Sequence, residues 1–245
     1  MTEYYLDAGT TWSKLLELDA EEQNLCLDAK YLIEKNKAFK DKNNKTRTGC
    51  LYLFPSKLLK NLDIKIDGAT GHMVKNMLKD KSGYLNEILA LAYGSKKKFG
   101  DCENRVILDI GSRDAKWIKF KNNKYQDLDW NGSCASATGA TIEMLCKFYN
   151  INTDTLPDVD EKHSVTCGVF GMERIMDDIA NDVSPEISIS KYIHGIAYNM
   201  WNFTSREKEI YLSGGLCLNK CFIKHLEKYC KVHPLGRNML ILGLF

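Results

Sequence analysis

The chain has 245 residues, 34 Lys and Arg against 32 Asp and Glu, and a formal net charge of +2, so no basic field argues for nucleic acid as the principal partner. Hydrophobic residues make up 44% of the chain, and its length fits two lobes of ordinary size around buried cores. The sequence shows neither a secretory signal pattern nor a long uncharged apolar run, so we expect a cytoplasmic location and no membrane partner.

The first predicted elements form a strand, a tight turn and a second strand over residues 4–18. Residues 35–47 are strongly polar and predict a loop or a frayed helix. Two apolar segments occupy residues 51–67, and a turn with two glycines follows at residues 67–72. Apolar residues at helical spacing predict a helix over 73–93, which Gly94 and the lysines at 96–98 are expected to close.

In the second half, residues 105–111 have a buried-strand pattern and residues 116–120 alternate like a return strand. Helices are predicted over 138–148, 172–179, 187–203 and 218–229, and a strand over 209–213 runs into a glycine turn. An Asp-x-Gly sequence, followed by small or hydroxyl residues and then Lys, occurs at residues 7–14 and again at 109–116. This weak duplication predicts an α/β protein with two similar lobes, 1–98 and 99–245, facing a cleft.

Each of these hairpins has the composition of a phosphate-binding turn. Glycines let backbone N–H groups approach phosphate oxygens, hydroxyls can add hydrogen bonds, and a carboxylate at the strand end can hold Mg²⁺ or its waters. The first hairpin offers Asp7, Gly9, Thr10, Thr11 and Lys14, and the second offers Asp109, Gly111, Ser112 and Asp114.

A later glycine turn and a helix start could complete a nucleotide site. Gly214 and Gly215 could bring backbone against an adenosine. Glu143 falls near the first turn of the helix that follows Thr138 and Gly139, where it could reach a ribose hydroxyl or only stabilise the helix dipole.

The order of these motifs resembles that of the acetate kinase, sugar kinase, Hsp70 and actin superfamily, in which two lobes of ribonuclease H-like fold clamp a nucleotide. Within it, the chain is similar to the activators of 2-hydroxyacyl-CoA dehydratases and the related ATPase subunits of benzoyl-CoA reductases. The segments that carry the likeness are residues 6–14, 69–72, 108–116, 131–139, 167–170 and 213–219.

The resemblance implies a homodimer with one [4Fe–4S] cluster between the subunits, each chain giving Cys134 and Cys167. ATP or ADP and Mg²⁺ are the implied cofactors, with Asp7, Asp109 and Asp114 in catalysis and the glycines, hydroxyls and Lys14 named above, together with Thr138, Gly139 and Glu143, binding the nucleotide. ATP binding and hydrolysis would reshape the dimer, so that a low-potential electron from ferredoxin or flavodoxin passes to a partner iron–sulfur dehydratase or reductase.

Two departures from the family pattern leave other functions open. Arg113 replaces a Gln and Ala115 a Ser in the second hairpin, which allows a regulatory or assembly subunit that keeps the cluster but has lost hydrolysis. A kinase-type phosphotransferase without a cluster is the third possibility. The other cysteines are expected to be small buried residues, with Cys217 and Cys221 packing on a helix rather than forming half of a second metal site; the others are Cys26, Cys50, Cys102, Cys146 and Cys230.

Overall fold

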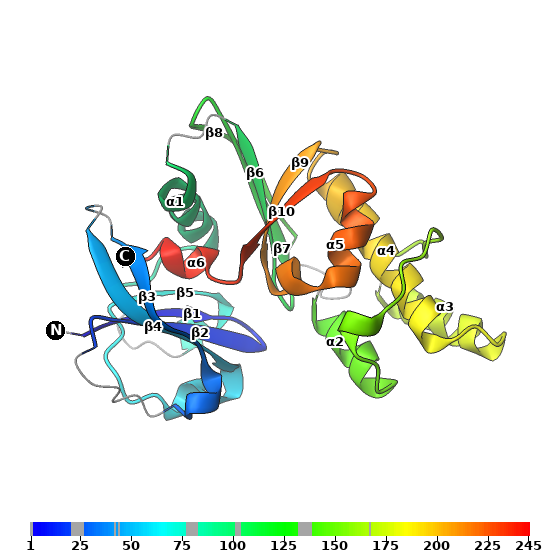
Figure 1. Cartoon of the computed structure of the whole chain (residues 1–245), viewed down its shortest axis with the longest axis horizontal. Helices are drawn as coiled ribbons and strands as arrows, with labels where there is room; N and C mark the ends of the chain where they lie inside the picture. The colour runs from blue at the N-terminus through cyan, green and yellow to red at the C-terminus, as the bar shows by residue number, and fades with distance from the viewer. Residues whose placement is uncertain are drawn as a thin grey trace. The chain divides into compact units, whose positions relative to one another are not determined.

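The structure is a computed structural model, which describes residues 2–20, 27–41, 43, 45–76, 83–100, 104–131, 139–166 and 168–245 (Figure 1). The chain divides into two compact units: unit 1 is Met1–Asp101 with Asn238–Phe245, and unit 2 is Cys102–Arg237. We expected a division after residue 98, with residues 99–245 in one lobe. The last eight residues, however, pack with unit 1, because α6 (Met239–Leu242) contacts α1 (Glu87–Phe99).

Unit 1 is built on a five-stranded sheet of order β3-β4-β2-β1-β5. Its strands are β1 (Glu3–Ala8), β2 (Trp12–Leu18), β3 (Leu32–Lys40), β4 (Thr46–Pro55) and β5 (Gly68–Thr70). All neighbours are antiparallel except β1 and β5. The short 3₁₀ helices are Ala29–Tyr31, Ser56–Asn61 and His72–Asn76. The β1–β2 hairpin agrees with the sequence prediction.

The expectation of a loop or frayed helix over residues 35–47 is wrong. This segment contains most of β3 and the start of β4. Its polar composition suits an edge strand, whose outer side chains face water while pairing with β4 satisfies its backbone. Phe39 is the exception in β3, because it is buried in the core. Polarity therefore marked exposure here and not the absence of a strand.

The helix expected over 73–93 is displaced toward the C-terminus. Residues 72–76 form a 3₁₀ helix, and α1 begins only after Asn86, whose side chain accepts a hydrogen bond from the Ile88 backbone N–H. Gly94 does not end the helix. A Cβ at Gly94 would lie 2.1 Å from the Met239 carbonyl oxygen, so this glycine admits the backbone of α6. The helix ends instead at Gly100, which has a φ of 59°.

Unit 2 contains a five-stranded sheet of order β10-β9-β6-β7-β8. Its strands are β6 (Arg105–Ile110), β7 (Ala115–Lys121), β8 (Lys124–Asn131), β9 (Glu209–Gly214) and β10 (Lys231–Gly236). The meander β6-β7-β8 is antiparallel, and β9 and β10 continue parallel to β6. The strands predicted over residues 105–111, 116–120 and 209–213 are present as β6, β7 and β9.

The helices of unit 2 are α2 (Gly139–Phe148), α3 (Gly168–Ala180), α4 (Pro185–Phe203) and α5 (Lys220–Glu227), with 3₁₀ helices at Thr153–Thr155 and Gly215–Leu218. The four predicted helices are confirmed, with α3 starting earlier than the apolar pattern indicated. The central helix is α4: Ser184 caps its N-terminus, Pro185 occupies its first turn, and its inner face is fully buried. Among the helices in the described part of the chain, none has the length and apolar character needed to span a membrane.

Candidate functional site

The β1–β2 hairpin of unit 1 joins Asp7 and Lys14 in a largely buried ion pair. The two residues face each other across the strands, with 2.5 Å between Lys14 Nζ and Asp7 Oδ2. Asp7 is 3% exposed. A buried charge requires a partner, and this pair puts one carboxylate and one ammonium group at the base of the turn.

The turn at residues 9–12 is held from below by Ser56. The Ser56 hydroxyl donates to the Gly9 carbonyl at 2.6 Å and lies 2.8 Å from the Ser13 hydroxyl, and its backbone N–H donates to the Thr11 carbonyl. Thr10 and Thr11 remain exposed at the tip. The backbone of the tip is therefore held by Ser56, while Thr10 and Thr11 are accessible to solvent.

The β6–β7 hairpin of unit 2 repeats this arrangement. Asp109 faces Lys116 across the strands, and Lys116 Nζ lies 3.6 Å from Asp109 and 3.2 Å from Asp114. Lys116 is 2% exposed. The Gly111 N–H donates to the Asp114 carbonyl at 2.9 Å and closes the turn. The buried lysine of the second hairpin is thus close to two carboxylates, whereas the lysine of the first hairpin is paired with one.

In each unit a parallel strand runs beside the aspartate, and a hydroxyl residue followed by a glycine stands at its end. Thr70 pairs with Asp7 and precedes Gly71, and Ser213 pairs with Asp109 and precedes Gly214. Both glycines have positive φ, 103° and 89°. A Cβ would lie 2.5 Å from the Ala8 carbonyl oxygen in unit 1 and 2.3 Å from the Ile110 carbonyl oxygen in unit 2. The internal duplication predicted from the two hairpins is confirmed, and it extends to these turns.

The hydroxyls of Thr70 and Ser213 are buried and have no hydrogen-bond partner among the described residues. Buried polar groups are nearly always paired in native proteins. Two unsatisfied hydroxyls at equivalent positions, each beside an aspartate, indicate that both strand ends need a further polar group. Together with the turn N–H groups, lysines and carboxylates, they form a chemical environment that suits phosphate and a hard cation.

Several other predicted residues gather at this end of the unit 2 sheet. Gly139 opens α2 and donates its N–H to the Gly111 carbonyl at 3.3 Å. Gly215 opens the 3₁₀ helix after β9. Glu143 lies exposed in α2. Cys134, Thr138 and Cys167 lie outside the described residues.

The cysteines that the structure describes are packing residues. Cys50, Cys146, Cys217, Cys221 and Cys230 are buried and form no disulfide. Burial raises the pKa of Cys146 and of Cys230 to about 11, and it also raises the pKa of Cys221. Their thiols are therefore neutral near pH 7. Within the described ranges no group of three or more His, Cys, Asp or Glu could hold a metal ion.

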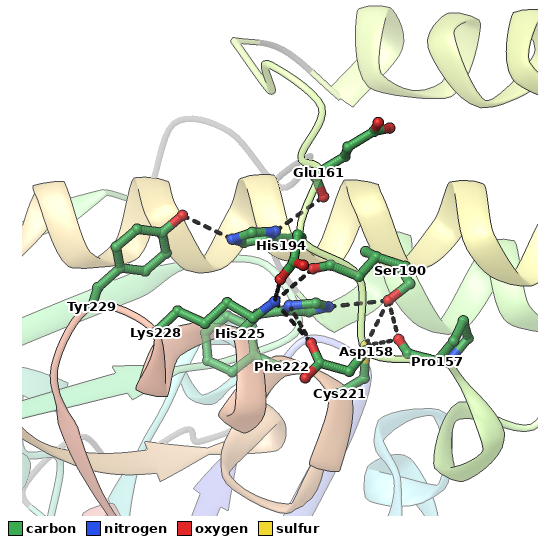
Figure 2. A network of polar contacts seen from close by, with 12 residues as sticks. Pro157, Asp158, Glu161, Ser190, His194, Cys221, Phe222, His225, Lys228 and Tyr229 are labelled. Atoms are coloured by element: carbon green, nitrogen blue, oxygen red, sulfur yellow. Dashed lines mark hydrogen bonds and ion pairs between the residues drawn. The ribbon is translucent and has the colours of Figure 1, made fainter.

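Sequence reasoning missed a buried polar network in unit 2, which Figure 2 shows between α4, α5 and the segment 157–161. The His194 and His225 rings are stacked, with 4.5 Å between centroids. His194 bonds the Glu161 carbonyl and the Tyr229 hydroxyl, and His225 Nε2 lies 3.0 Å from the Ser190 hydroxyl. The network fastens this segment, which leads toward Cys167, to α4 and α5.

Ser190, His225 and Asp158 superficially match a Ser-His-Asp triad, but their hydrogen bonds run the wrong way. The Ser190 hydroxyl donates its single proton to the Pro157 carbonyl, so His225 Nε2 must donate to Ser190. His225 Nδ1, 3.5 Å from Asp158, has no hydrogen-bond partner among the described residues. A catalytic triad needs the histidine to accept from the serine and donate to the carboxylate. The network is structural.

The network should make unit 2 sensitive to acid. Burial lowers the pKa of His225 to about 4, with His194 and Lys228 adding to the effect while Asp158 and Asp160 oppose it, and burial also lowers the pKa of His194. Because these folded-state values lie below the unfolded value, the unfolded chain gains protons first, and stability present above pH 6.5 is lost as the pH falls toward 4. We expect a loss of about 3 kcal/mol from His225 in urea titrations.

A variant that cannot titrate at this position tests the assignment. Gln at position 225 retains an N–H that can donate to Ser190 but has no proton to gain. His225→Gln should therefore show a much smaller fall in unfolding free energy between pH 6.5 and 4 than the parent. Equal slopes for the two proteins would refute the role given to His225.

No family model matches the sequence. The chain is 28% identical over 175 residues to an activator of lactoyl-CoA dehydratase from Anaerotignum propionicum, covering 66% of this chain and 65% of that protein. It is 23% identical over 193 residues to a 2-hydroxyisocaproyl-CoA dehydratase activator from Clostridioides difficile, covering 71% of each chain. A 124-residue match, 23% identical, links it to the (R)-2-hydroxyglutaryl-CoA dehydratase activating ATPase of Acidaminococcus fermentans, over 46% of this chain and 47% of that protein. The match thus spans slightly less than two thirds of the first relative's length.

Solved structures agree on the fold. The activator of the 2-hydroxyisocaproyl-CoA dehydratase from Clostridium difficile, determined with bound ADPNP, superposes with a TM-score of 0.72 at 18% identity and covers 100% of this chain and 92% of its own. Component A of the Acidaminococcus fermentans (R)-2-hydroxyglutaryl-CoA dehydratase gives a TM-score of 0.66 at 18% identity, over 99% of this chain and 96% of its own. In sequence the chain is similar to activators of 2-hydroxyacyl-CoA dehydratases, and it shares the two-lobed α/β fold of two of their solved structures.

Proposed function

We propose that this chain is an ATP-dependent iron–sulfur activator, which passes a low-potential electron to a 2-hydroxyacyl-CoA dehydratase or a related reductase. The observation that carries the proposal is the repeated unit of hairpin, buried aspartate–lysine pair and hydroxyl–glycine turn, found once in each unit. The names of the relatives supply the activator role. Ferredoxin or flavodoxin would be the electron donor.

The two hairpins would bind the phosphates of MgATP. Turn N–H groups and the hydroxyls of Thr10, Thr11 and Ser112 would donate to phosphate oxygens, and Lys14 would neutralise phosphate charge. Asp7 in unit 1, and Asp109 and Asp114 in unit 2, are the carboxylates that could orient the waters around Mg²⁺. Gly214 and Gly215 would admit the adenosine, because side chains there would crowd it. Bound Mg²⁺ would supply charge stabilisation during phosphoryl transfer.

Cys134 and Cys167 would hold a [4Fe–4S] cluster together with the same two residues of a second copy. Cys167 immediately precedes α3, and Cys134 lies five residues before α2. Burial raises the pKa of the Cys146, Cys221 and Cys230 thiols, which disfavours the thiolate form that a cluster ligand needs.

A homodimer would also cover apolar side chains that the single chain exposes on the helices beside these cysteines. Phe148 is 76% exposed and Val169 is 65% exposed. The exposed set on α2 and α3 comprises Met144, Phe148, Val169, Phe170 and Met176. Exposed apolar side chains such as these are candidates for burial in a subunit interface.

Iron analysis tests the cluster directly. We expect about four irons and four sulfides per dimer after anaerobic purification, and loss of most of both in Cys134→Ala and in Cys167→Ala. Cys146→Ala, which removes a buried thiol in the same unit, should retain the parent's iron. A colourless parent that binds ATP but cannot be reconstituted with iron would refute the electron-transfer function and favour a kinase-type phosphotransferase.

The substitutions in the second hairpin favour one alternative. Arg113 and Ala115 stand where the resemblance leads us to expect Gln and Ser, so hydrolysis could be lost while the cluster is retained. The chain would then be a regulatory or assembly subunit. Steady-state release of phosphate from MgATP by the cluster-loaded protein separates this function from that of an activating ATPase.

A further inference from the structure

The sheet of unit 2 ends in two edge strands of different kinds. β10 contains Pro234, and its register with β9 shifts between Pro234 and Gly236, so this edge is irregular. At the other edge, β8 contains no proline and pairs residue by residue with β7 over residues 127–131. A regular edge strand offers a row of backbone N–H and C=O groups to any strand that approaches it. β8 is therefore the edge on which a further strand could add.

The exposed side chains of β8 would favour such an addition. Tyr125 is 58% exposed and Trp130 is 46% exposed. The Trp130 indole N–H is bonded to Asp114 Oδ2 at 2.7 Å, so the rest of its exposed ring is apolar. Aromatic side chains stabilise cross-strand pairs, and their burial removes apolar surface from water. On backbone regularity and exposed aromatic rings alone, β8 should associate with another strand.

Two backbone N–H groups of β8 are already bonded within the strand. The Leu128 N–H donates to Asp127 Oδ1 at 2.9 Å, and the Trp130 N–H donates to Asp129 Oδ1 at 2.7 Å. Alternate residues of a strand direct their N–H groups to the same side, and an N–H that donates to a side chain of its own strand lies outside the ladder with β7. Both groups therefore belong to the free side of β8. Hydrogen bonds to a carboxylate are stronger than those to the neutral carbonyls that an added strand would supply.

The same two carboxylates would oppose the pairing of β8 with β8 of a second copy. An isologous antiparallel pairing centred on Leu128 would place each aspartate opposite an aspartate of the other copy. Like charges directly opposite each other across a strand pair are destabilising. Self-pairing would thus have to break two charge-assisted hydrogen bonds in each copy and bring four carboxylates together.

We propose that Asp127 and Asp129 keep the β8 edge closed to strand addition, and that the partner they exclude is β8 of a second copy of this chain. The inference goes beyond the proposed function and does not depend on it. The two side chains act on the backbone of their own strand, and neither contacts a nucleotide or a cluster in this scheme.

Sedimentation of the full-length, anaerobically purified protein over a range of concentrations tests the inference. Asp127→Ala/Asp129→Ala removes both acceptors and both charges from exposed positions, so the fold should be retained. At high concentration this variant should reach at least about twice the weight-average mass of the parent, because one isologous contact doubles the particle. Hydrogen exchange in peptides covering residues 124–131 of the variant should slow as its concentration rises, which would place the contact on β8.

Two further variants separate the hydrogen bonds from the charge. Asp127→Asn/Asp129→Asn keeps an oxygen acceptor for each N–H and should remain much closer to the parent's mass than the alanine variant does. Asp160→Ala/Glu227→Ala removes two exposed carboxylates of unit 2 that lie outside the sheet, and should sediment as the parent does. An alanine variant of Asp127 and Asp129 with the parent's mass would overturn the inference. So would association without protection of residues 124–131, or an asparagine variant that associates as strongly as the alanine variant.

Discussion

Asp109→Asn should lower the rate of MgATP hydrolysis by about 10²- to 10³-fold while changing nucleotide affinity by less than about threefold. Asn has the same shape, keeps the β6 pairing and leaves Lys116 its contact with Asp114. It removes the negative charge that would hold Mg²⁺ or orient its waters. The measurement is phosphate release under saturating nucleotide, paired with a binding titration.

An exposed carboxylate of the same unit provides the control for this variant. Asp160 is fully exposed and pairs with Lys228. Asp160→Asn should hydrolyse MgATP at the parent's rate. Hydrolysis by Asp109→Asn within about threefold of the parent would remove Asp109 from the catalytic machinery. If the parent protein binds MgATP but does not hydrolyse it measurably, the result would instead support the alternative function, a regulatory or assembly subunit.

Gly214→Ala should lower the free energy of unfolding by at least about 4 kcal/mol, and should abolish measurable nucleotide binding. The φ of 89° is unfavourable for any side chain. The new Cβ would also lie 2.3 Å from the Ile110 carbonyl oxygen, in a backbone that cannot move without breaking the β6–β9 pairing. Urea denaturation provides the measurement.

Gly100→Ala separates the cost of a positive φ from the cost of the steric clash. Gly100 also has positive φ, 59°, but a Cβ there would meet no atom within 4 Å. Its replacement should cost about 2 kcal/mol, the conformational part alone. If Gly214→Ala cost no more than Gly100→Ala, the close backbone approach at β9 would have no energetic importance.

The hairpins could be predicted from sequence because their signal is local. An alternating apolar pattern, an Asp-x-Gly turn and a returning lysine lie within about a dozen residues in each unit, and the register that pairs Asp7 with Lys14 recurs for Asp109 and Lys116. The helices of unit 2 could be predicted for the same reason. Apolar residues recur at helical spacing along α4, and this local pattern indicates a buried helix face.

The errors arose where contacts with other elements decide the outcome. β3 is a strand because β4 pairs with it, although its own residues are polar. Gly94 lies inside α1, where it leaves room for the backbone of Met239, far along the chain, and it does not end the helix. The same holds for the contacts that shape the site. The hydrogen bonds from Ser56 to the Gly9 carbonyl and from Trp130 to Asp114 could not be predicted either. In both cases the donor and the acceptor are brought together by the fold, and no local sequence pattern marks the pair.

The return of residues 238–245 to unit 1 has a consequence for biosynthesis. Unit 2 is a continuous stretch inserted between two parts of unit 1, and the backbones of α1 and α6 approach each other at Gly94 and Gly243. Residues 238–245 follow the whole of unit 2 in the chain, so the core of unit 1 cannot be completed until unit 2 has been synthesised. Until then the sheet of unit 1 lacks the cover of Ile241 and Phe245, which share its core.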